Sequence, residues 1–445
     1  MGESCDPRPR VALLALGCRV SRADVDALAG ELAPGFAVAR AGERADLVVV
    51  NTCAITCDAD AAARQAIRRA AREHPGAPIV AAGCCAEIRP AALAALPGVA
   101  AVVGARSGER VADVVAALAP ARVKAPPAGA AVPVGWSGFS GTPASRARPL
   151  LKVQDGCDRS CAYCIVPAAR GRSRSLPVDE ALRRMALLGA RHAEVVLTGV
   201  DLGAYGRDLS PRTSLRALIE EAAGRRLVRR IRLSSIDPGD LPVDLLRDGP
   251  ARGFLCEHFH LPLQSGSERV LRAMRRPRAA RDFRRAVEAL ATLAPGACFG
   301  TDVLAGFPGE TEADHRETVA LVASLPVAYL HVFPFSARPG TPAAYMTGAV
   351  PARVVKERVN ELRALSARRW RAHLAAQVGR DVEVVAERTA GGFARGTADR
   401  YVTVRWPSST AAAPRGATVR VRIVAVDGEE CLGVAARALT SRLPP

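Results

Sequence analysis

Cysteine residues form the tightest chemical group in this 445-residue chain, which contains 12 of them. Cys157, Cys161 and Cys164 stand in C-x3-C-x2-C spacing within the segment LLKVQDGCDRSCAYCIVP. Three thiolates leave one iron of a [4Fe–4S] cube without a protein ligand and open to an outside donor. A structural zinc ion needs four ligands, and the next candidate along the chain is only His192. The spacing therefore predicts an iron–sulfur cluster with one open iron.

That open iron determines the chemistry we expect. S-adenosylmethionine (SAM) can chelate it through its amino and carboxylate groups, which places the sulfonium where an electron from the cluster breaks a C–S bond. The product is a deoxyadenosyl radical. Beyond the cluster ligands, the sequence indicates no further catalytic side chain.

A second set consists of Cys18, Cys53 and Cys84, each of which follows a short apolar run, at residues 11–16, 46–50 and 78–82. The carboxyl ends of parallel strands share one edge of a sheet, so these three thiols should converge and hold a second cluster. The alternative is three small buried residues at strand ends, because free cysteine is commonly buried. We leave Cys57 and Cys85 out of the ligand set.

The expected cellular location of the protein favours metal binding by its cysteines over disulfide formation. The apolar run Val11–Leu16 is shorter than the core of a signal peptide, and no run of 18 apolar residues occurs. We therefore expect a cytosolic, soluble protein with no membrane contact. Thiols stay reduced there, which favours metal binding.

The order of apolar runs predicts an α/β multidomain chain. Residues 1–119 are predicted to form a parallel α/β sheet domain, and the Pro/Gly/Ala-rich residues 120–149 are predicted to form a linker. Residues 150–373 alternate strand and helix and fit an open (β/α)6 barrel, with strands expected at 150–154, 194–198, 230–235, 258–263, 299–305 and 327–335. Five short β runs within residues 374–440 fit a small OB-like barrel.

Polar and glycine residues follow the barrel strands, where α/β barrels collect their chemistry. Glycine permits close approach of a ligand to the backbone, and Ser, Asp and Gln offer hydrogen-bond partners for ribose hydroxyls and an ammonium group. Each residue alone could equally be a turn residue or a cap. The candidates for binding SAM are Gly199, Asp201, Ser234, Ser235, Gln264 and Gly306.

Charge favours a polyanionic partner. The net charge is +18, and residues 268–285 carry eight Arg against two acidic residues. Such a balance promotes nucleic-acid binding through counterion release, although a solvated helix face is the alternative for the basic run. In the last domain, candidates for stacking on or pairing with RNA, which could equally be core residues, are Phe393, Arg395, Arg400, Tyr401 and Trp406.

Several motifs together resemble the radical-SAM methylthiotransferase family over nearly the whole chain. They are LGC at Cys18, NTCAIT at Cys53, GC at Cys84 and CDRSCAYCIVPAARGRSRS from Cys157. Five further segments are most similar to the MtaB type, which acts on threonylcarbamoyladenosine at tRNA position 37: LTGVDLGAYG, LSSIDP, HLPLQSGSERVLRAMRR, TDVLAGFPGETE and HVFPFSARPGTPA.

The resemblance implies an N-terminal cluster domain, a radical-SAM barrel and a C-terminal TRAM domain that holds RNA. It also implies two [4Fe–4S] clusters, two SAM molecules and transfer of a methylthio group to carbon 2 of the adenine in a tRNA anticodon loop. The first three cysteines match auxiliary-cluster ligands, the later three match SAM-cluster ligands, and Tyr163 matches a neighbour of the SAM adenine. The target base must leave its stack, and candidate RNA contacts are Arg170, Arg172 and Arg174. A flavodoxin or ferredoxin would supply electrons, and the oligomeric state stays open.

Departures from the family pattern occur at Ser21-Arg22-Ala23, at Ala168 and at Pro277-Arg278. Alternative substrates are N6-isopentenyladenosine at position 37 of tRNA and an aspartate of a ribosomal protein. The first type usually has Gly-Gln-Asn at Gly199-Val200-Asp201, and the second typically has Gln-His at Gln264-Ser265. A non-catalytic iron–sulfur protein that binds RNA is the alternative from a different functional class.

Overall fold

The computed structural model describes residues 8–119, 146–246, 253–276, 279–409 and 413–439. The first part is a five-stranded parallel sheet in the order β2-β1-β3-β4-β5. Its strands are β1 (Arg10–Ala15), β2 (Ala37–Val38), β3 (Leu47–Thr52), β4 (Ile79–Gly83) and β5 (Val99–Gly104). Its helices are α1 (Arg19–Leu32), α2 (Cys57–Glu73), α3 (Cys84–Ile88), α4 (Pro90–Ala94) and α5 (Val111–Leu118).

Both faces of this sheet are covered, which explains its apolar strands. All six residues of β3 are buried. On one face, Val49 packs in a cluster with Leu28 of α1 and Val115 of α5. On the other face, Val48 packs with Ile67 of α2. The sheet can therefore present ligands only at its strand ends.

The central part is an open barrel made of two three-stranded parallel sheets, β10-β9-β6 and β11-β12-β13. A parallel bridge between Ile231 and Leu255 connects the two sheets. The strands are β6 (Leu150–Lys152), β9 (Glu194–Thr198), β10 (Arg230–Leu233), β11 (His258–His260), β12 (Cys298–Ala305) and β13 (Val327–Pro334). Its helices are α7 (Val178–Gly189), α8 (Leu215–Gly224), α9 (Glu268–Ala273), α10 (Ala280–Leu293) and α11 (Glu312–Ser324). The predicted partial barrel is confirmed.

Alternate residues of these strands differ sharply in polarity. The outward set packs with the helices in the largest apolar cluster and includes Leu197, Ile231 and Phe259. The intervening residues are buried but polar: Lys152, Glu194, Thr198, Arg230, Arg232, Ser234, His258 and His260. Because successive side chains of a strand point to opposite faces, this second set lines the inside of the barrel. The interior is therefore polar, unlike the apolar filling of a closed barrel.

The last part is a closed five-stranded barrel in the order β14-β15-β16-β18-β17, as the sequence predicts. Helix α12 (Ala352–Ala375) leads into it, and its strands are β14 (Asp381–Ala390), β15 (Phe393–Ala398), β16 (Thr403–Pro407), β17 (Thr418–Asp427) and β18 (Glu430–Leu439). Trp406 is fully buried in its core, so it is not available to stack on RNA as one reading of the sequence allowed.

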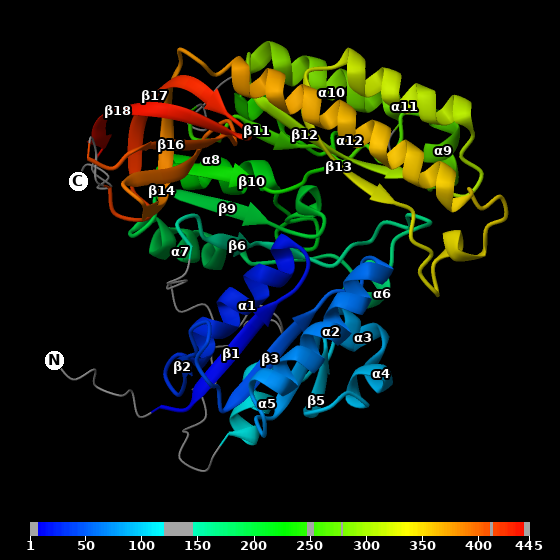
Figure 1. The fold of residues 1–445 in the computed structure, drawn as a ribbon, viewed down its shortest axis with the longest axis vertical. Helices are drawn as coiled ribbons and strands as arrows, with labels where there is room; N and C mark the ends of the chain where they lie inside the picture. Colours follow the sequence, from blue (N-terminus) through cyan, green and yellow to red (C-terminus); the bar gives the residue numbers. More distant parts are fainter. Residues whose placement is uncertain (1–7, 120–145, 247–252, 277–278, 410–412, 440–445) are drawn as a thin grey trace.

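The three parts pack against one another (Figure 1). The N-terminal sheet lies below the central strands with α1 facing β6, and the C-terminal barrel sits at one end of the central strands. Arg232 joins the two barrels, since its Nη2 donates to the Ala398 carbonyl at 2.9 Å. Most of the predicted linker, residues 120–145, and the departure at Pro277-Arg278 lie outside the described residues. Within the described chain, no helix has the length and apolar character to cross a membrane.

Candidate active site with two cysteine groups

Cys18, Cys53 and Cys84 come together at the carboxyl edge of the N-terminal sheet. Cys18 caps the start of α1, Cys53 follows β3 directly, and Cys84 opens α3 after β4. Burial raises the pKa of the Cys84 thiol to about 11, and the charges of Cys53 and Cys18 also raise it. All three thiols follow neighbouring parallel strands and so lie at the same edge of the sheet, as their positions in the sequence predict.

Two glycines make this convergence possible. Gly17 has φ +90°, and a Cβ at that position would lie 2.6 Å from Cys53 Sγ. Gly83 has φ +93°, and a Cβ there would lie 2.1 Å from Asn51 Oδ1. Only glycine adopts this conformation easily and leaves room for the neighbouring strand end. The turns before Cys18 and Cys84 are therefore shaped for close approach.

Cys157, Cys161 and Cys164 occupy the loop between β7 (Gln154–Asp155) and α6 (Val166–Arg170). The loop is held by backbone hydrogen bonds: the Cys157 N–H donates to the Gly171 carbonyl at 3.0 Å, and the Ala162 N–H donates to the Met274 carbonyl at 2.8 Å. Burial raises the pKa of Cys157 to about 11 and that of Cys164 to about 12. The charges of Cys161 and Cys157 also raise the pKa of Cys164.

Both groups fit iron–sulfur clusters by their donor sets. Thiolates are the preferred ligands of such clusters, and a coordinated metal removes the proton that burial otherwise retains on the sulfur. Of the described residues, only His260, Asp302 and His331 bring three ligand atoms within 4.8 Å of one another.

The two cysteines left out of the ligand set have other partners. Cys57 begins α2, and its Sγ lies 3.5 Å from Arg338 Nη1. Cys85 is buried, and its thiol lies 3.1 Å from Asp60 Oδ1. Neither residue needs a metal to explain its position.

Arg159 fixes the second cysteine loop to the neighbouring strand ends. Its guanidinium donates to Asp201 Oδ2 at 2.8 Å, to Asp237 Oδ2 at 2.8 Å and to Asp240 Oδ2 at 2.5 Å. Arg276 donates to Asp237 as well, at 2.9 Å. These charge-assisted bonds are stronger than neutral ones and orient the loops after β9 and β10 against the cysteines.

Arg170 links the first cysteine group to the strand that leads into the second cysteine loop. Its Nε donates to Cys84 Sγ at 3.2 Å, and its Nη1 donates to Asp155 Oδ1 at 3.0 Å. Its Nη2 donates to Asp24 Oδ2 of α1 at 2.8 Å. Arg170 is only 5% exposed, so the prediction that it contacts RNA is wrong. The Arg172 side chain, in contrast, is 94% exposed.

The residues predicted to bind SAM lie at the strand ends but in different settings. Tyr163 stands inside the cysteine loop and packs against the central core. A Cβ at Gly199 would lie 2.9 Å from Gln154 Oε1. Asp201 pairs with Arg159, and the Gly306 N–H already donates to Glu310 Oε2 at 2.6 Å.

Ser234 and Ser235 differ in exposure. Ser234 is buried, and its hydroxyl is among the buried polar atoms of the described residues that have no hydrogen-bond partner. Ser235 is exposed. Gln264 has φ +74°, and its backbone pairs with β12. The Ser234 hydroxyl therefore has the clearest need of a ligand.

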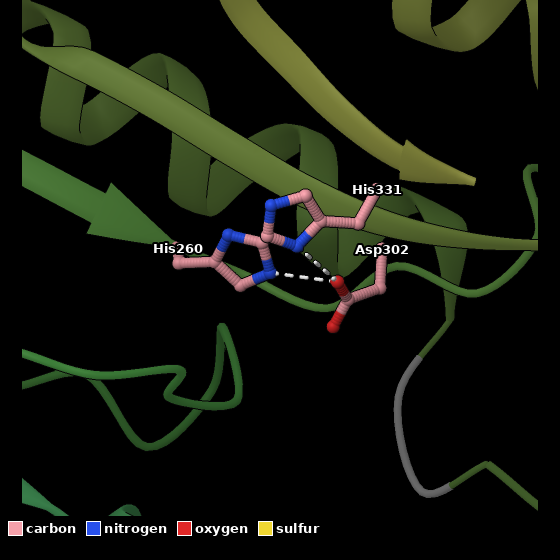
Figure 2. A group of neighbouring side chains, drawn as sticks. All are labelled: His260, Asp302 and His331. Carbon is pink, nitrogen blue, oxygen red and sulfur yellow. Dashed lines mark hydrogen bonds and ion pairs between the residues drawn. The ribbon is translucent and has the colours of Figure 1, made fainter. Parts of the chain in front are cut away.

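One polar group inside the barrel was not predicted as a site, although each of its three residues belongs to one of the family-like segments (Figure 2). His260 Nε2 lies 2.8 Å from Asp302 Oδ1, and His331 Nδ1 lies 3.3 Å from the same oxygen. Burial alone would raise the pKa of Asp302, but the charge of His260 and the hydrogen bonds from both imidazoles outweigh it and hold the pKa below its ordinary value. The strand period could have identified these residues, because they alternate with outward apolar neighbours.

Comparisons with known proteins match these parts. The Radical SAM superfamily model matches residues 151–322, and that of the uncharacterized protein family UPF0004 matches residues 10–104. The radical SAM methyltransferase TsrM from Kitasatospora setae shares the fold, with a TM-score of 0.53, 17% identity and coverage of 76% of this chain and 77% of its own.

Three relatives carry names for different substrates. The threonylcarbamoyladenosine tRNA methylthiotransferase MtaB of Aquifex aeolicus is 35% identical over 80% of this chain and 87% of its own length. The ribosomal protein uS12 methylthiotransferase RimO of Desulforudis audaxviator is 34% identical over 86% of both chains. The tRNA-2-methylthio-N(6)-dimethylallyladenosine synthase of a Parafrankia species is 34% identical over 83% of this chain and 76% of its own. The chain therefore belongs to the radical-SAM methylthiotransferases, enzymes that use SAM and [4Fe–4S] clusters.

Proposed function

We propose that this enzyme adds a methylthio group to carbon 2 of N6-threonylcarbamoyladenosine at position 37 of tRNA, using two SAM molecules and two [4Fe–4S] clusters. The observation that carries the proposal is the pair of three-cysteine groups, with Arg170 bonding Cys84 of the first group and Asp155 just before the second cysteine loop. The sequence likeness to the Aquifex aeolicus MtaB supports this substrate over its alternatives.

In this proposal the two groups have separate roles. Cys157, Cys161 and Cys164 hold the cluster that, when bound, supplies the electron for SAM cleavage. Cys18, Cys53 and Cys84 hold the auxiliary cluster that carries the sulfur. Arg159 keeps the cysteine loop against the ends of β9 and β10, where Asp201, Ser234 and the other predicted contacts would hold SAM.

We also propose residues 1–119, 150–373 and 374–440 as the cluster, radical-SAM and RNA-binding TRAM-like domains. Arg172 suits a phosphate contact because its side chain is almost fully exposed. Phe393 is 43% exposed, with the guanidinium of Arg405 5.1 Å from its ring centre, so this surface suits stacking on an unpaired base.

The first experiment counts iron. After anaerobic reconstitution with iron and sulfide we expect about eight irons per chain, and about four when Cys18, Cys53 and Cys84 are all changed to Ala. A count of about four in both proteins would contradict the two-cluster proposal.

The second experiment identifies the substrate. The reconstituted enzyme is incubated with SAM, a reductant and tRNA carrying either threonylcarbamoyladenosine or isopentenyladenosine, and nucleosides are analysed by mass spectrometry. We expect a methylthio product from the first tRNA only. A product from the second tRNA alone would assign the enzyme to the dimethylallyl type, which is the second candidate because one relative carries that name.

A further inference from the structure

Arg19 lies where the three parts of the molecule meet. It follows Cys18 in the first turn of α1, and its Nη2 donates to the Tyr401 hydroxyl of the C-terminal barrel at 3.3 Å. Its charge also acts on Tyr329 and His258 inside the central barrel. Among the described residues no carboxylate forms an ion pair with it. Arg19 is therefore a partly buried cation beside the auxiliary cysteines.

Tyr401 stacks on His258, which belongs to a hydrogen-bonded row of side chains inside the central barrel. Asp302 lies opposite His331 in the β12–β13 pairing and accepts from His331 and His260 through one oxygen. Figure 2 shows its second oxygen directed away from both rings. His260 Nδ1 lies 3.0 Å from the Tyr329 hydroxyl, which lies 2.8 Å from His258 Nε2.

This row reaches both cysteine groups. At one end, the charge of Asp302 acts on Tyr163 inside the SAM-cluster loop. At the other end, the ring of Tyr401 stacks on His258 with centroids 4.0 Å apart, and Tyr401 bonds Arg19 next to Cys18. We call Arg19, His260, Asp302, Tyr329 and His331 the polar lining. Its members are thus linked at one end to the residue after Cys18 and at the other end to Tyr163, between Cys161 and Cys164.

We propose that the polar lining recognises the substituent on N6 of the target adenosine, with Arg19 pairing its carboxylate and Asp302 accepting from its N–H group. The inference rests on the proposed function and deepens it. A threonylcarbamoyl group carries a carboxylate, a hydroxyl and one N–H donor, whereas a dimethylallyl group is a hydrocarbon with none of these. A site built from charged and hydrogen-bonding groups rejects a ligand that leaves them unpaired.

The two ends of the lining require this orientation. Asp302 is held as a carboxylate, so it repels a second carboxylate and favours a donor. Arg19 is cationic and offers a planar fork that matches a carboxylate. The anionic end of the substituent therefore points to Arg19 and the N–H end points to Asp302.

The test uses synthetic anticodon stem-loops with threonylcarbamoyladenosine, its uncharged carboxamide analogue, or adenosine at position 37. Equilibrium dissociation constants are measured for the reconstituted enzyme, for Arg19→Met and for Arg22→Met. Arg22 is exposed on the same helix, so both variants lose one positive charge and share the same loss of general attraction for RNA. We expect the wild type to prefer the carboxylate over the carboxamide by about 10- to 100-fold. Arg19→Met should lose this preference, and Arg22→Met should keep it.

An Asp302→Asn variant tests the other end and should weaken binding of the carboxylate and the carboxamide equally. A preference that persists in Arg19→Met would overturn the inference even if the wild type forms the methylthio product. A wild type that binds with the expected preference but forms no product would overturn the proposed function alone. If a chelator abolished the wild type's preference for the carboxylate, direct pairing with Arg19 would be overturned. That result would instead indicate a divalent cation bound by His260, Asp302 and His331.

Discussion

Arg170 illustrates how much one buried side chain can organise. Its three donor nitrogens reach a cysteine thiol, a carboxylate of the barrel and a carboxylate of α1. A lysine could not satisfy this arrangement, because it offers a point charge in place of a rigid fork. Buried charges persist only when paired, and here the pairing joins two domains.

Changing Arg170 to Gln should lower the reduction potential of the auxiliary cluster. The cationic donor favours the more negative, reduced cluster, so its loss favours the oxidised form. Each kcal/mol of lost preference corresponds to roughly 40 mV for a one-electron couple. An EPR-monitored redox titration measures this in a background where Cys157, Cys161 and Cys164 are Ala.

Arg172→Gln is the matched control, since its side chain is 94% exposed and should leave the potential unchanged. Iron content is determined for each variant to verify that the auxiliary cluster is present. Equal potentials in the two variants would contradict the tuning role of Arg170.

At the scale of elements, the local pattern of apolar residues predicted the strands well. It did not predict the side-chain contacts between residues that are far apart in the sequence. Strand β3 is a continuous apolar run, and the cysteines follow β1, β3 and β4 as the topology requires. Arg170 pairs with Asp24, 146 positions away, and Arg19 bonds Tyr401, 382 positions away. No local period encodes such contacts, because they depend on how whole domains dock. Arg170 was therefore mistaken for a surface residue.

Helix α12 contributes a pH-dependent contact to the C-terminal barrel. Burial lowers the pKa of His373 to about 4, although its contact with the Arg400 carbonyl partly opposes this. In the unfolded chain His373 binds a proton near pH 6.5, whereas in the folded chain it stays neutral until about pH 4. The free energy of unfolding is therefore highest above pH 6.5 and decreases as the pH falls from 6.5 toward 4.

His373→Gln should therefore show a shallower loss of stability between pH 7 and pH 5 than the wild type, by up to roughly 2 kcal/mol. Urea unfolding followed by tryptophan fluorescence at both pH values measures the difference. Parallel losses in the two proteins would mean that His373 does not set the slope.

At the scale of the whole molecule, the net charge of +18 is only partly available to a partner. Within the basic run, Arg269 pairs with Asp314 and Arg276 pairs with Asp237 beside the cysteine loop. Arg269 is exposed but already paired, and Arg276 is buried, so neither is a free surface charge for RNA. Exposed residues such as Arg172 remain for phosphates.

Binding of tRNA should depend steeply on salt. If about five phosphates are neutralised, raising the salt fourfold from 50 to 200 mM should weaken binding on the order of 100-fold or more. Filter binding or fluorescence anisotropy over this range gives the slope. A flat dependence would indicate that the positive charge serves solubility rather than RNA.

The bond between Arg170 and Cys84 also has a consequence for biosynthesis. All three auxiliary cysteines leave the ribosome before residue 170, so the N-terminal sheet can form while Cys84 still lacks its cationic neighbour. The pocket is complete only after α6 has been made and has docked. An iron–sulfur carrier that delivers a cluster to the nascent chain would meet the three cysteines without Arg170. A carrier that delivers it to the released protein would meet the complete site.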